Sequence, residues 1–300
     1  MGVANTRPRA EDIIYKASGD AGCSRMPRSV YSGSWRNWSC LGDLYRNQGK
    51  PKEAEEMYHI ALKGKEQALV PAHGSTLNTV NNLGVLYRNQ GSLKKAEDMF
   101  QRALKGREEA LGPDHASTLG IVNNLGIVYA GQGMLKRAEE MYQRASKGRE
   151  KILGPYDPLT LRTINNFGIL YAKHNKKMKA EEMYQRALTG YEKELGPEHT
   201  LTLSTVNNLG VLYANHGELK KAEETYQRAL KGYEKALELN HTLTRDAANN
   251  LDILHADQDK LKEEDATSDE SRFGSSTEET IDEMSWAIME CLESRRRRGG

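Results

Sequence analysis

Asparagine side chains recur at one position of this 300-residue chain, at intervals of 42 residues. Each of them stands directly before an apolar residue. An amide offers two N–H donors and one carbonyl acceptor, so a row of amides can hold the backbone of an extended peptide. The same amides can instead tie neighbouring segments of the chain together, and both roles stay open. The row consists of Asn82, Asn124, Asn166, Asn208 and Asn250.

Further candidate residues share a helical face with this row. In a helix, the positions four before, three after and seven after an asparagine lie on the same side. They combine amides, aliphatic side chains and a few positive charges, which suits an extended, mildly acidic peptide with one or two large apolar anchors. These positions hold Asn78, Val85 and Asn89 in one copy, Gly120, Ile127 and Gly131 in the next, Arg162, Ile169 and Lys173 in the one after, and Ser204, Val211 and Asn215 in the last.

Histidines form a second recurring column, made of His73, His115, His199 and His241. The remaining copy has Asp157 at this place, followed by Pro158. Aspartate followed by proline is typical of a helix start, with the first residue as N-cap and the second as N1. The column therefore predicts helix caps. Because its members lie a full repeat apart, we expect neither a metal site nor a catalytic histidine.

These columns belong to an internal repeat. The strings LGDLYRNQG, LGVLYRNQG, LGIVYAGQG, FGILYAKHN and LGVLYANHG begin at Leu41, Leu83, Leu125, Phe167 and Leu209, and a degraded copy, LDILHADQD, begins at Leu251. A period of this length is typical of solenoids, in which each repeat buries its apolar surface against its neighbours.

Each copy is expected to form two helices. In the second copy, apolar residues at helical spacing predict a first helix over 75–89 and a second over 93–111. Gly91 suits the left-handed position after the first helix, and Gly112 with Pro113 ends the second. The architecture predicted is an all-α, right-handed α-α superhelix with five full repeats and a sixth first helix.

Small residues in both helices indicate close packing. Gly84 and Ala96 would let the two helix backbones approach, with Phe100 filling the space above them. A glycine also recurs inside every second helix, where it costs about 1 kcal/mol relative to alanine. That repeated cost predicts a close approach to a neighbouring helix. The glycines inside the second helices are Gly64, Gly106, Gly148, Gly190 and Gly232.

The order of Leu-Gly-x-x-Tyr followed by Ala, an aromatic residue and Ala on the next helix resembles the tetratricopeptide repeat. The 42-residue form with LGPDH at Leu111 or LGPEH at Leu195 between copies is similar to the repeats of kinesin light chains. It is equally similar to the repeat arrays of NB-ARC-type receptors. The resemblance covers about residues 35–256 and implies a protein-binding scaffold or adaptor with the asparagine row in its concave groove.

Both families have parts that the chain lacks. Only about 34 residues precede the first copy, and they contain no sustained heptad pattern of the kind that joins kinesin light chains to the heavy chain. The heavy chain is therefore not an expected partner. No GxxxxGK[ST] phosphate loop is present either. A stand-alone adaptor and the partner-binding fragment of a signalling receptor both fit this pattern.

Composition narrows the function classes. The chain is 37 % hydrophobic and 28 % charged, with a net charge of +1, which suggests neither a nucleic-acid partner nor membrane insertion. Three cysteines and the absence of an apolar leader favour a cytoplasmic protein. No motif for catalysis or for a cofactor occurs, so we expect a binding protein and no enzyme. A myristoylation pattern at Gly2 is too short to decide.

Four segments are expected along the chain: an irregular segment over 1–34, the repeat array over 35–256, an acidic linker over 257–279 and a short amphipathic helix with an arginine-rich end over 280–300. The last segment places Asp282, Glu283, Met284 and Trp286 together. Kinesin-light-chain-like arrays bind peptides with a tryptophan among acidic residues, so one hypothesis makes this segment an internal ligand of the groove. A helix that caps the solenoid and a free recognition segment are the alternatives.

Overall fold

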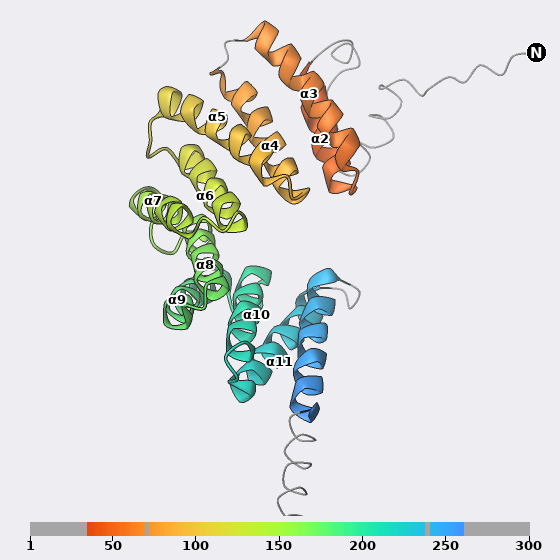
Figure 1. The fold of residues 1–300 in the computed structure, drawn as a ribbon, viewed down its shortest axis with the longest axis vertical. Coiled ribbons are helices and arrows are strands. Elements are labelled where there is room, and N and C mark those ends of the chain that lie inside the picture. Colours follow the sequence, from red (N-terminus) through yellow and green to blue (C-terminus); the bar gives the residue numbers. More distant parts are fainter. Residues whose placement is uncertain (1–34, 70–71, 238–240, 261–300) are drawn as a thin grey trace, which may run out of the picture. The chain divides into compact units, whose positions relative to one another are not determined.

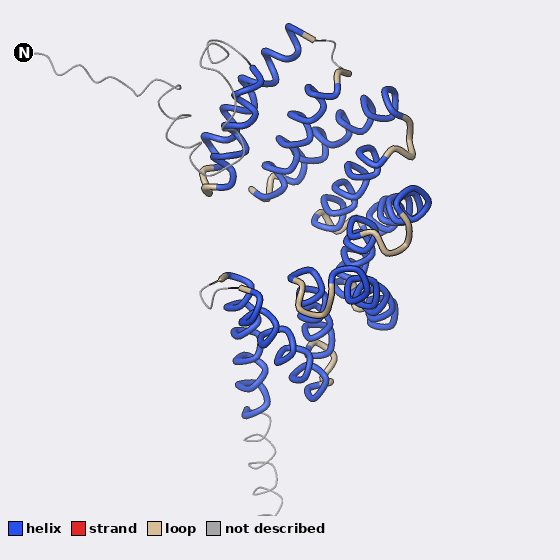
Figure 2. Tube along the Cα trace, turned by 180° about the vertical axis from the view of Figure 1, so that it is seen from behind, coloured by secondary structure: helices blue, strands red, loops and turns tan. Residues whose placement is uncertain are grey.

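The computed structural model describes residues 35–69, 72–237 and 241–260, and these residues form helices joined by short turns, with no strand among them (Figure 2). The chain divides into two compact units, residues 1–196 and 197–300. The predicted segments over 1–34 and 280–300, with Gly2, Asp282, Glu283, Met284 and Trp286, lie outside the described residues, as does nearly all of 257–279. None of the helices described is long and apolar enough to cross a membrane.

Successive helices pair with one another in both units (Figure 1). We call the first helix of each repeat helix A and the second helix B. In the first unit the A helices are α2 (Trp35–Asn47), α4 (Gly74–Asn89), α6 (Ala116–Gly131) and α8 (Pro158–Lys173), and the B helices are α3 (Pro51–Ala68), α5 (Leu93–Leu111), α7 (Leu135–Leu153) and α9 (Lys177–Leu195). The second unit contains α10 (Thr200–Ala214), α11 (Leu219–Ala236) and a helix over 242–260.

Within the first unit, each A helix from α4 onward packs against its own B helix and against the B helix before it. Consecutive A helices also touch. This sequential packing of helix pairs confirms the predicted all-helical tetratricopeptide solenoid.

A glycine on helix A and an aromatic ring on helix B hold each pair together. A Cβ atom at Gly84 would lie 2.7 Å from Phe100 Cε1, and one at Gly126 would lie 2.7 Å from Tyr142 Cε1. Since real Cβ atoms do not approach so closely, only glycine admits the ring. Phe100 and Tyr142 are almost completely buried as a result. The close approach predicted for Gly84 is confirmed.

The glycines inside the B helices also meet a neighbour. A Cβ atom at Gly106 would lie 2.7 Å from Leu77 Cδ2, and one at Gly148 would lie 2.7 Å from Leu119 Cδ1. Gly190 and Gly232 face Leu161 and Leu203 in the same way. The prediction of a packing role is confirmed at these four positions, because each glycine makes room for a leucine of its own repeat's helix A.

The turn from helix A to helix B uses a left-handed residue. Gly91 has φ = +73°, and the N–H of the next residue, Ser92, donates to the Tyr87 carbonyl at 2.8 Å. Gly133 repeats this conformation at φ = +75°. At the fourth copy Asn175 adopts φ = +56°, which asparagine tolerates better than most residues. The predicted left-handed position of Gly91 is confirmed.

The histidine column caps the A helices. The Nδ1 atoms of His73 and His115 accept hydrogen bonds from the backbone N–H groups of Ser75 and Ser117, at 3.1 and 3.2 Å. His199 and His241 do the same for Leu201 and Leu243. At the fourth copy, Asp157 Oδ1 accepts from the Leu159 N–H at 2.8 Å. The prediction that this column caps helices is therefore confirmed.

Replacing His115 tests the strength of these caps. His115→Ala removes the acceptor for the Ser117 N–H, so we expect the free energy of unfolding to fall by about 1 kcal/mol. His115→Asp supplies the acceptor found at Asp157 and adds a negative charge near the positive end of the helix dipole, so stability should equal or exceed that of the wild type. Urea denaturation followed by circular dichroism would measure both. Equal stability of the alanine variant and the wild type would contradict the capping role.

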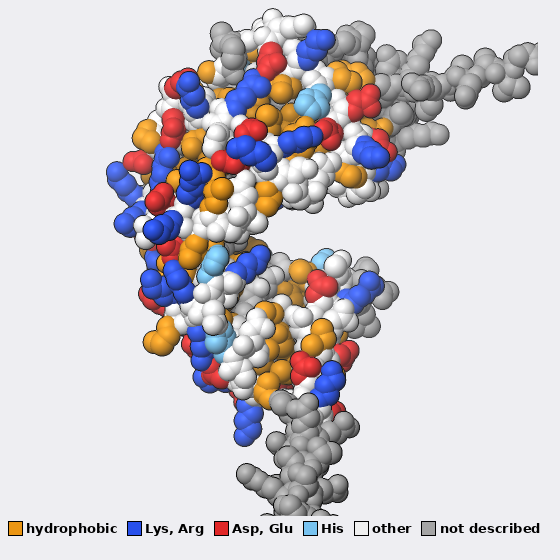
Figure 3. Space-filling model, in the orientation of Figure 1, with side chains coloured by type: hydrophobic (Ala, Val, Ile, Leu, Met, Phe, Trp, Pro, Cys, Tyr) orange, Lys and Arg blue, Asp and Glu red, His pale blue; other side chains and the backbone are white. Residues whose placement is uncertain are grey.

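Polar contacts join neighbouring repeats at their B helices. Arg144 of α7 pairs with Glu108 of α5 at 2.5 Å, and Arg102–Glu66 and Arg186–Glu150 are the equivalent pairs. Basic and acidic side chains accordingly lie side by side over α7 (Figure 3). Such exposed pairs contribute little stability individually.

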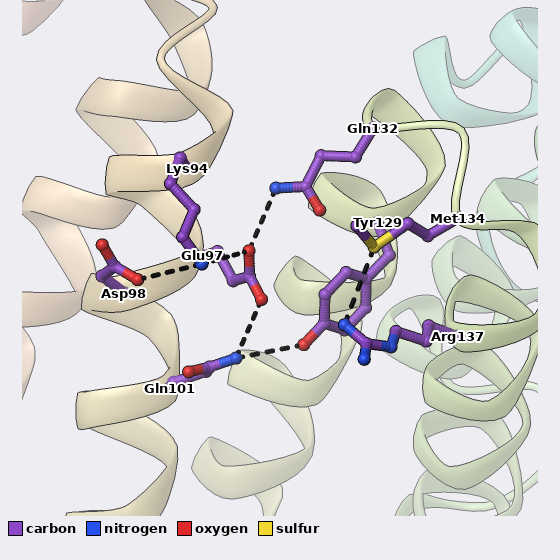
Figure 4. A network of polar contacts seen from close by, with 8 residues as sticks. All are labelled: Lys94, Glu97, Asp98, Gln101, Tyr129, Gln132, Met134 and Arg137. Atoms are coloured by element: carbon purple, nitrogen blue, oxygen red, sulfur yellow. Dashed lines mark hydrogen bonds and ion pairs between the residues drawn. The ribbon is translucent and has the colours of Figure 1, made fainter.

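A buried carboxylate, Glu97, connects α5 to α6 (Figure 4). It accepts hydrogen bonds from Gln132 Nε2 at 3.1 Å and from Gln101 Nε2 at 2.9 Å, and it pairs with Lys94. Burial raises the pKa of Glu97, but the hydrogen bonds from Gln132 and Lys94 outweigh burial and bring it below its usual range. The network therefore holds a charged carboxylate at the junction of two repeats, which is a structural role.

In the second unit, the helix over 242–260 packs on the pair formed by α10 and α11. Leu254 joins Ala222 and Tyr226 in a buried cluster, and Leu251 packs against it. The position that holds glycine in the earlier A helices holds Asp252 here, and this residue is exposed. This last helix therefore lacks the glycine that admits an aromatic ring in the repeats before it.

Candidate functional site

The asparagine row links consecutive A helices. Asn124 Nδ2 donates to Asn81 Oδ1 at 3.3 Å, and Asn166 Nδ2 donates to Asn123 Oδ1 at 3.3 Å. Asn82 donates to Asp43 Oδ1 at 3.2 Å, and in the second unit Asn250 donates to Asn207 at 3.1 Å. These contacts show that the asparagines link neighbouring repeats, which is one of the two roles considered from the sequence. Since each bond uses one of two N–H groups, a second N–H remains for a ligand.

Aliphatic side chains run beside the asparagine row. Val85, Ile127 and Ile169 lie on α4, α6 and α8, and all three are half-buried. In the second unit, Val211 is 37 % exposed and Ile253 is 60 % exposed. Ile253 was not among the residues predicted from the sequence, although it follows Asn250 by the same three positions. We call the surface formed by the asparagine row and these aliphatic residues, in either unit, the A-helix face.

The remaining predicted residues lie on the A helices or at their ends. Asn78 accepts a hydrogen bond from Arg107, and Asn89 accepts one from Arg88 Nη2 at 3.1 Å. Arg162 and Lys173 are exposed on α8. In the second unit, Ser204 Oγ lies 2.9 Å from Tyr233 Oη, Asn215 is the exposed C-cap of α10, and Asn208 is half-buried.

Cations that are buried or half-buried within the repeats are the feature that the sequence prediction missed. Lys65, Arg107 and Arg149 occupy equivalent positions of α3, α5 and α7, while α9 and α11 have Tyr191 and Tyr233 there. Their 42-residue spacing could have revealed them. Lys65 is 3 % exposed, and its Nζ donates to Ser39 Oγ at 2.7 Å and Thr79 Oγ1 at 2.6 Å. Burial lowers the pKa of Lys65.

Arg149 is the most perturbed of these cations. It is 2 % exposed, and its Nη1 donates to the Leu159 carbonyl at 2.8 Å and to Thr163 Oγ1 at 2.6 Å. Burial, aided by the charge of Arg162, lowers the pKa of Arg149 to about 10. Burial also lowers the pKa of Arg88, and the positive charges of Arg162 and Arg46 lower it further. Arg88 and Arg149 therefore both lie within electrostatic range of Arg162 in the first unit.

The arrangement favours binding over catalysis. Among the described residues, no group of three His, Cys, Asp or Glu side chains is placed to hold a metal ion. The histidines of the recurring column are used as helix caps, and Glu97 is held by hydrogen bonds inside a repeat junction. What the A-helix face presents is a set of amides, aliphatic side chains and guanidinium groups, which are recognition groups.

Comparison with known families agrees with this geometry. The model of the tetratricopeptide repeat matches residues 36–109, 75–151, 114–193 and 178–235. Among curated proteins, none matches the chain.

Similar solved structures include proteins related to kinesin light chains. BtubC (BKLC) from P. vanneervenii is 26 % identical, with a TM-score of 0.58, over 67 % of this chain and 80 % of that one. The nearly identical TPR-like repeats of a kinesin light chain candidate from Podospora anserina are 21 % identical, with a TM-score of 0.57, over 68 % and 96 %. Aspartyl phosphate phosphatase F from Bacillus subtilis is 13 % identical, with a TM-score of 0.64, over 76 % and 57 %. The last two show a shared fold alone.

Proposed function

Because the chain belongs to the tetratricopeptide repeat family, whose members generally bind other proteins, we propose that it is a scaffold or adaptor that binds an extended peptide along its A-helix face. The cytoplasmic location expected from the sparse cysteines is part of this proposal. The ligand would be mildly acidic, with one or two large apolar anchors. The resemblance to kinesin-light-chain-like arrays supports the adaptor role.

One observation carries the proposal. In the first unit, the aliphatic residues Val85, Ile127 and Ile169 alternate along the A-helix face with amides that keep an N–H group available. The aliphatic side chains can take the apolar anchors, and the amides can donate to the peptide backbone between them. Arg88, Arg162 and Lys173 supply the positive charge that an acidic ligand requires.

Affinity capture with mass spectrometry tests the proposal. The bait would be the full chain beside the triple variant Asn124→Glu, Asn166→Glu and Asn208→Glu. The added carboxylates should repel an acidic peptide and break its amide contacts, so we expect the bound partners to fall at least tenfold. Recovered partners would also show whether the complex concerns a motor subunit or a signalling component.

Two further variants separate binding from folding. Arg162→Glu with Lys173→Glu changes charge without touching the described asparagine contacts, and it should also lose the partners. Gln143→Glu, Gln185→Glu and Thr189→Glu add three carboxylates at exposed positions of the B helices α7 and α9 and should keep them. Recovery of the same partners by all baits would show that the A-helix face is not the binding surface.

A further inference from the structure

Arg107 and Arg149 are equivalent residues of consecutive repeats, but among the described residues only Arg107 has an acceptor side chain on helix A of its own repeat. Arg107 Nη2 donates to Asn78 Oδ1 and to the Gly74 carbonyl, the latter at 3.4 Å. The residue of the next repeat that corresponds to Asn78 is Gly120. Arg149 therefore faces a position without a side chain, where its counterpart faces an amide oxygen.

The geometry around Gly120 shows that Arg149 lacks an acceptor side chain at this position. A Cβ atom at Gly120 would lie 3.5 Å from Arg149 Nη2, so a side chain there would reach the guanidinium directly. Both hydrogen bonds described for Arg149 use Nη1, and its buried Nε has no partner among the described residues. Arg149 Nη2, the atom that faces Gly120, makes no hydrogen bond among the described residues, so an external acceptor placed over Gly120 can pair with it.

A second guanidinium, that of Arg162, lies within electrostatic range of Arg149. Arg162 is on α8 between Leu159 and Thr163, the two residues whose oxygens bind Arg149 Nη1, and its side chain is exposed. The nearby carboxylate, Asp157, already accepts the Leu159 N–H as the N-cap of α8. Burial and the charge of Arg162 lower the pKa of Arg149, which is the effect expected where positive charge is not balanced.

We propose that the space over Gly120, between Arg149 and Arg162, binds a phosphate monoester dianion carried by a phosphorylated serine or threonine of the peptide ligand. A phosphate offers three acceptor oxygens, enough for Arg149 Nη2 and the Arg162 fork together, and its charge of nearly −2 balances two guanidinium groups. A carboxylate carries about half the charge of the phosphate, and its two oxygens pair with only one guanidinium group in a bidentate manner. That the phosphate arrives on a peptide rests on the proposed function, whereas the anion site does not.

Titration of the full chain with small anions tests the site without any peptide. The probes are inorganic phosphate and O-phosphoserine, compared with acetate at constant ionic strength. Signals of arginine Nε–H groups in ¹H–¹⁵N spectra, assigned with Arg149→Lys and Arg162→Lys, report binding. We expect saturable shifts of the Arg149 and Arg162 signals, with phosphate and O-phosphoserine at least tenfold tighter than acetate.

Repeat equivalence provides matched variants. Gly120→Asn supplies the acceptor that Arg107 already has, and its Cβ meets only ordinary contacts, so the variant should fold normally and lose the phosphate response. Asn78→Gly removes the acceptor side chain of Arg107, but the residue that corresponds to Arg162 there is Gly120, so this variant should add no second phosphate site of comparable affinity. Arg162→Gln should weaken phosphate binding at least fivefold.

Three results would overturn the proposal: no phosphate response in the wild type, an unchanged response in Gly120→Asn, or acetate binding as tightly as phosphate. If the small anions bind as expected but the affinity-capture variants lose no partner, the anion site stands and the proposed peptide function fails.

Discussion

Replacing Tyr142 with alanine is expected to lower the free energy of unfolding by about 3–5 kcal/mol, the range for removing a large buried ring. The Tyr142 ring is 2 % exposed, lies against Gly126 and is 5.8 Å from the Phe167 ring centroid of the next repeat. Its loss opens a cavity at the junction of α6, α7 and α8, and glycine at position 126 has no side chain to fill it. Urea denaturation followed by circular dichroism would measure the change.

Tyr156→Ala is the matched control for this prediction. Tyr156 is 43 % exposed and contacts Lys193, whose Nζ lies 3.9 Å from the ring centroid. Its removal should cost no more than about 1 kcal/mol. Equal losses in the two variants would show that the ring on Gly126 does not hold the repeats together.

Replacing Arg149 with methionine is expected to raise the free energy of unfolding, by about 1–4 kcal/mol. Methionine keeps much of the side-chain volume and removes a buried charge whose Nε has no partner among the described residues. Thr163 Oγ1 still donates to the Leu159 carbonyl at 3.0 Å in its absence, so no buried donor is left unpaired there. The same variant should lose the phosphate response, so stability and binding would change in opposite directions.

The pH dependence of the stability difference between Arg149→Met and the wild type tests whether the buried charge of Arg149 causes it. Burial lowers the pKa of Arg149 to about 10, well below its usual range, so the folded state disfavours the bound proton. The cost is present at neutral pH and falls as pH rises through 10. The stability gap between Arg149→Met and the wild type should therefore stay constant up to about pH 9 and narrow as pH rises above about 10. Lys147→Met, at an exposed position of the same helix, should show no such gap. A wild type more stable than Arg149→Met at neutral pH would contradict the prediction.

The helices could be predicted from the sequence because their boundaries depend on local residues. The second copy was expected to have helices over 75–89 and 93–111, and the structure has Gly74–Asn89 and Leu93–Leu111. Gly91 and the cap at His73 set these limits through backbone contacts within a few residues. Packing glycines such as Gly106 were also predictable, since a glycine repeated inside a helix requires a compensating contact.

The candidate site was harder to predict because it depends on side-chain partners from different repeats. An asparagine can donate to a ligand or to another asparagine, and only the structure shows that Asn166 bonds Asn123. Arg149 resembles an ordinary surface arginine in the sequence, beside charged neighbours on a polar helix. Its burial follows from its position against α8, and its missing acceptor follows from the absence of a side chain at Gly120.

The contacts that join repeats also affect how the number of repeats in this protein can change during evolution. The described hydrogen bonds between the asparagines join residues 43 positions apart, and the arginine–glutamate pairs join residues 36 apart. No described bond of these two types reaches past the adjacent copy, so duplicating or deleting one 42-residue copy recreates the same junctions on both sides. Gene duplication can therefore lengthen the array by whole copies while the contacts at each junction are preserved. A longer array could then bind a longer ligand without new contacts between its repeats.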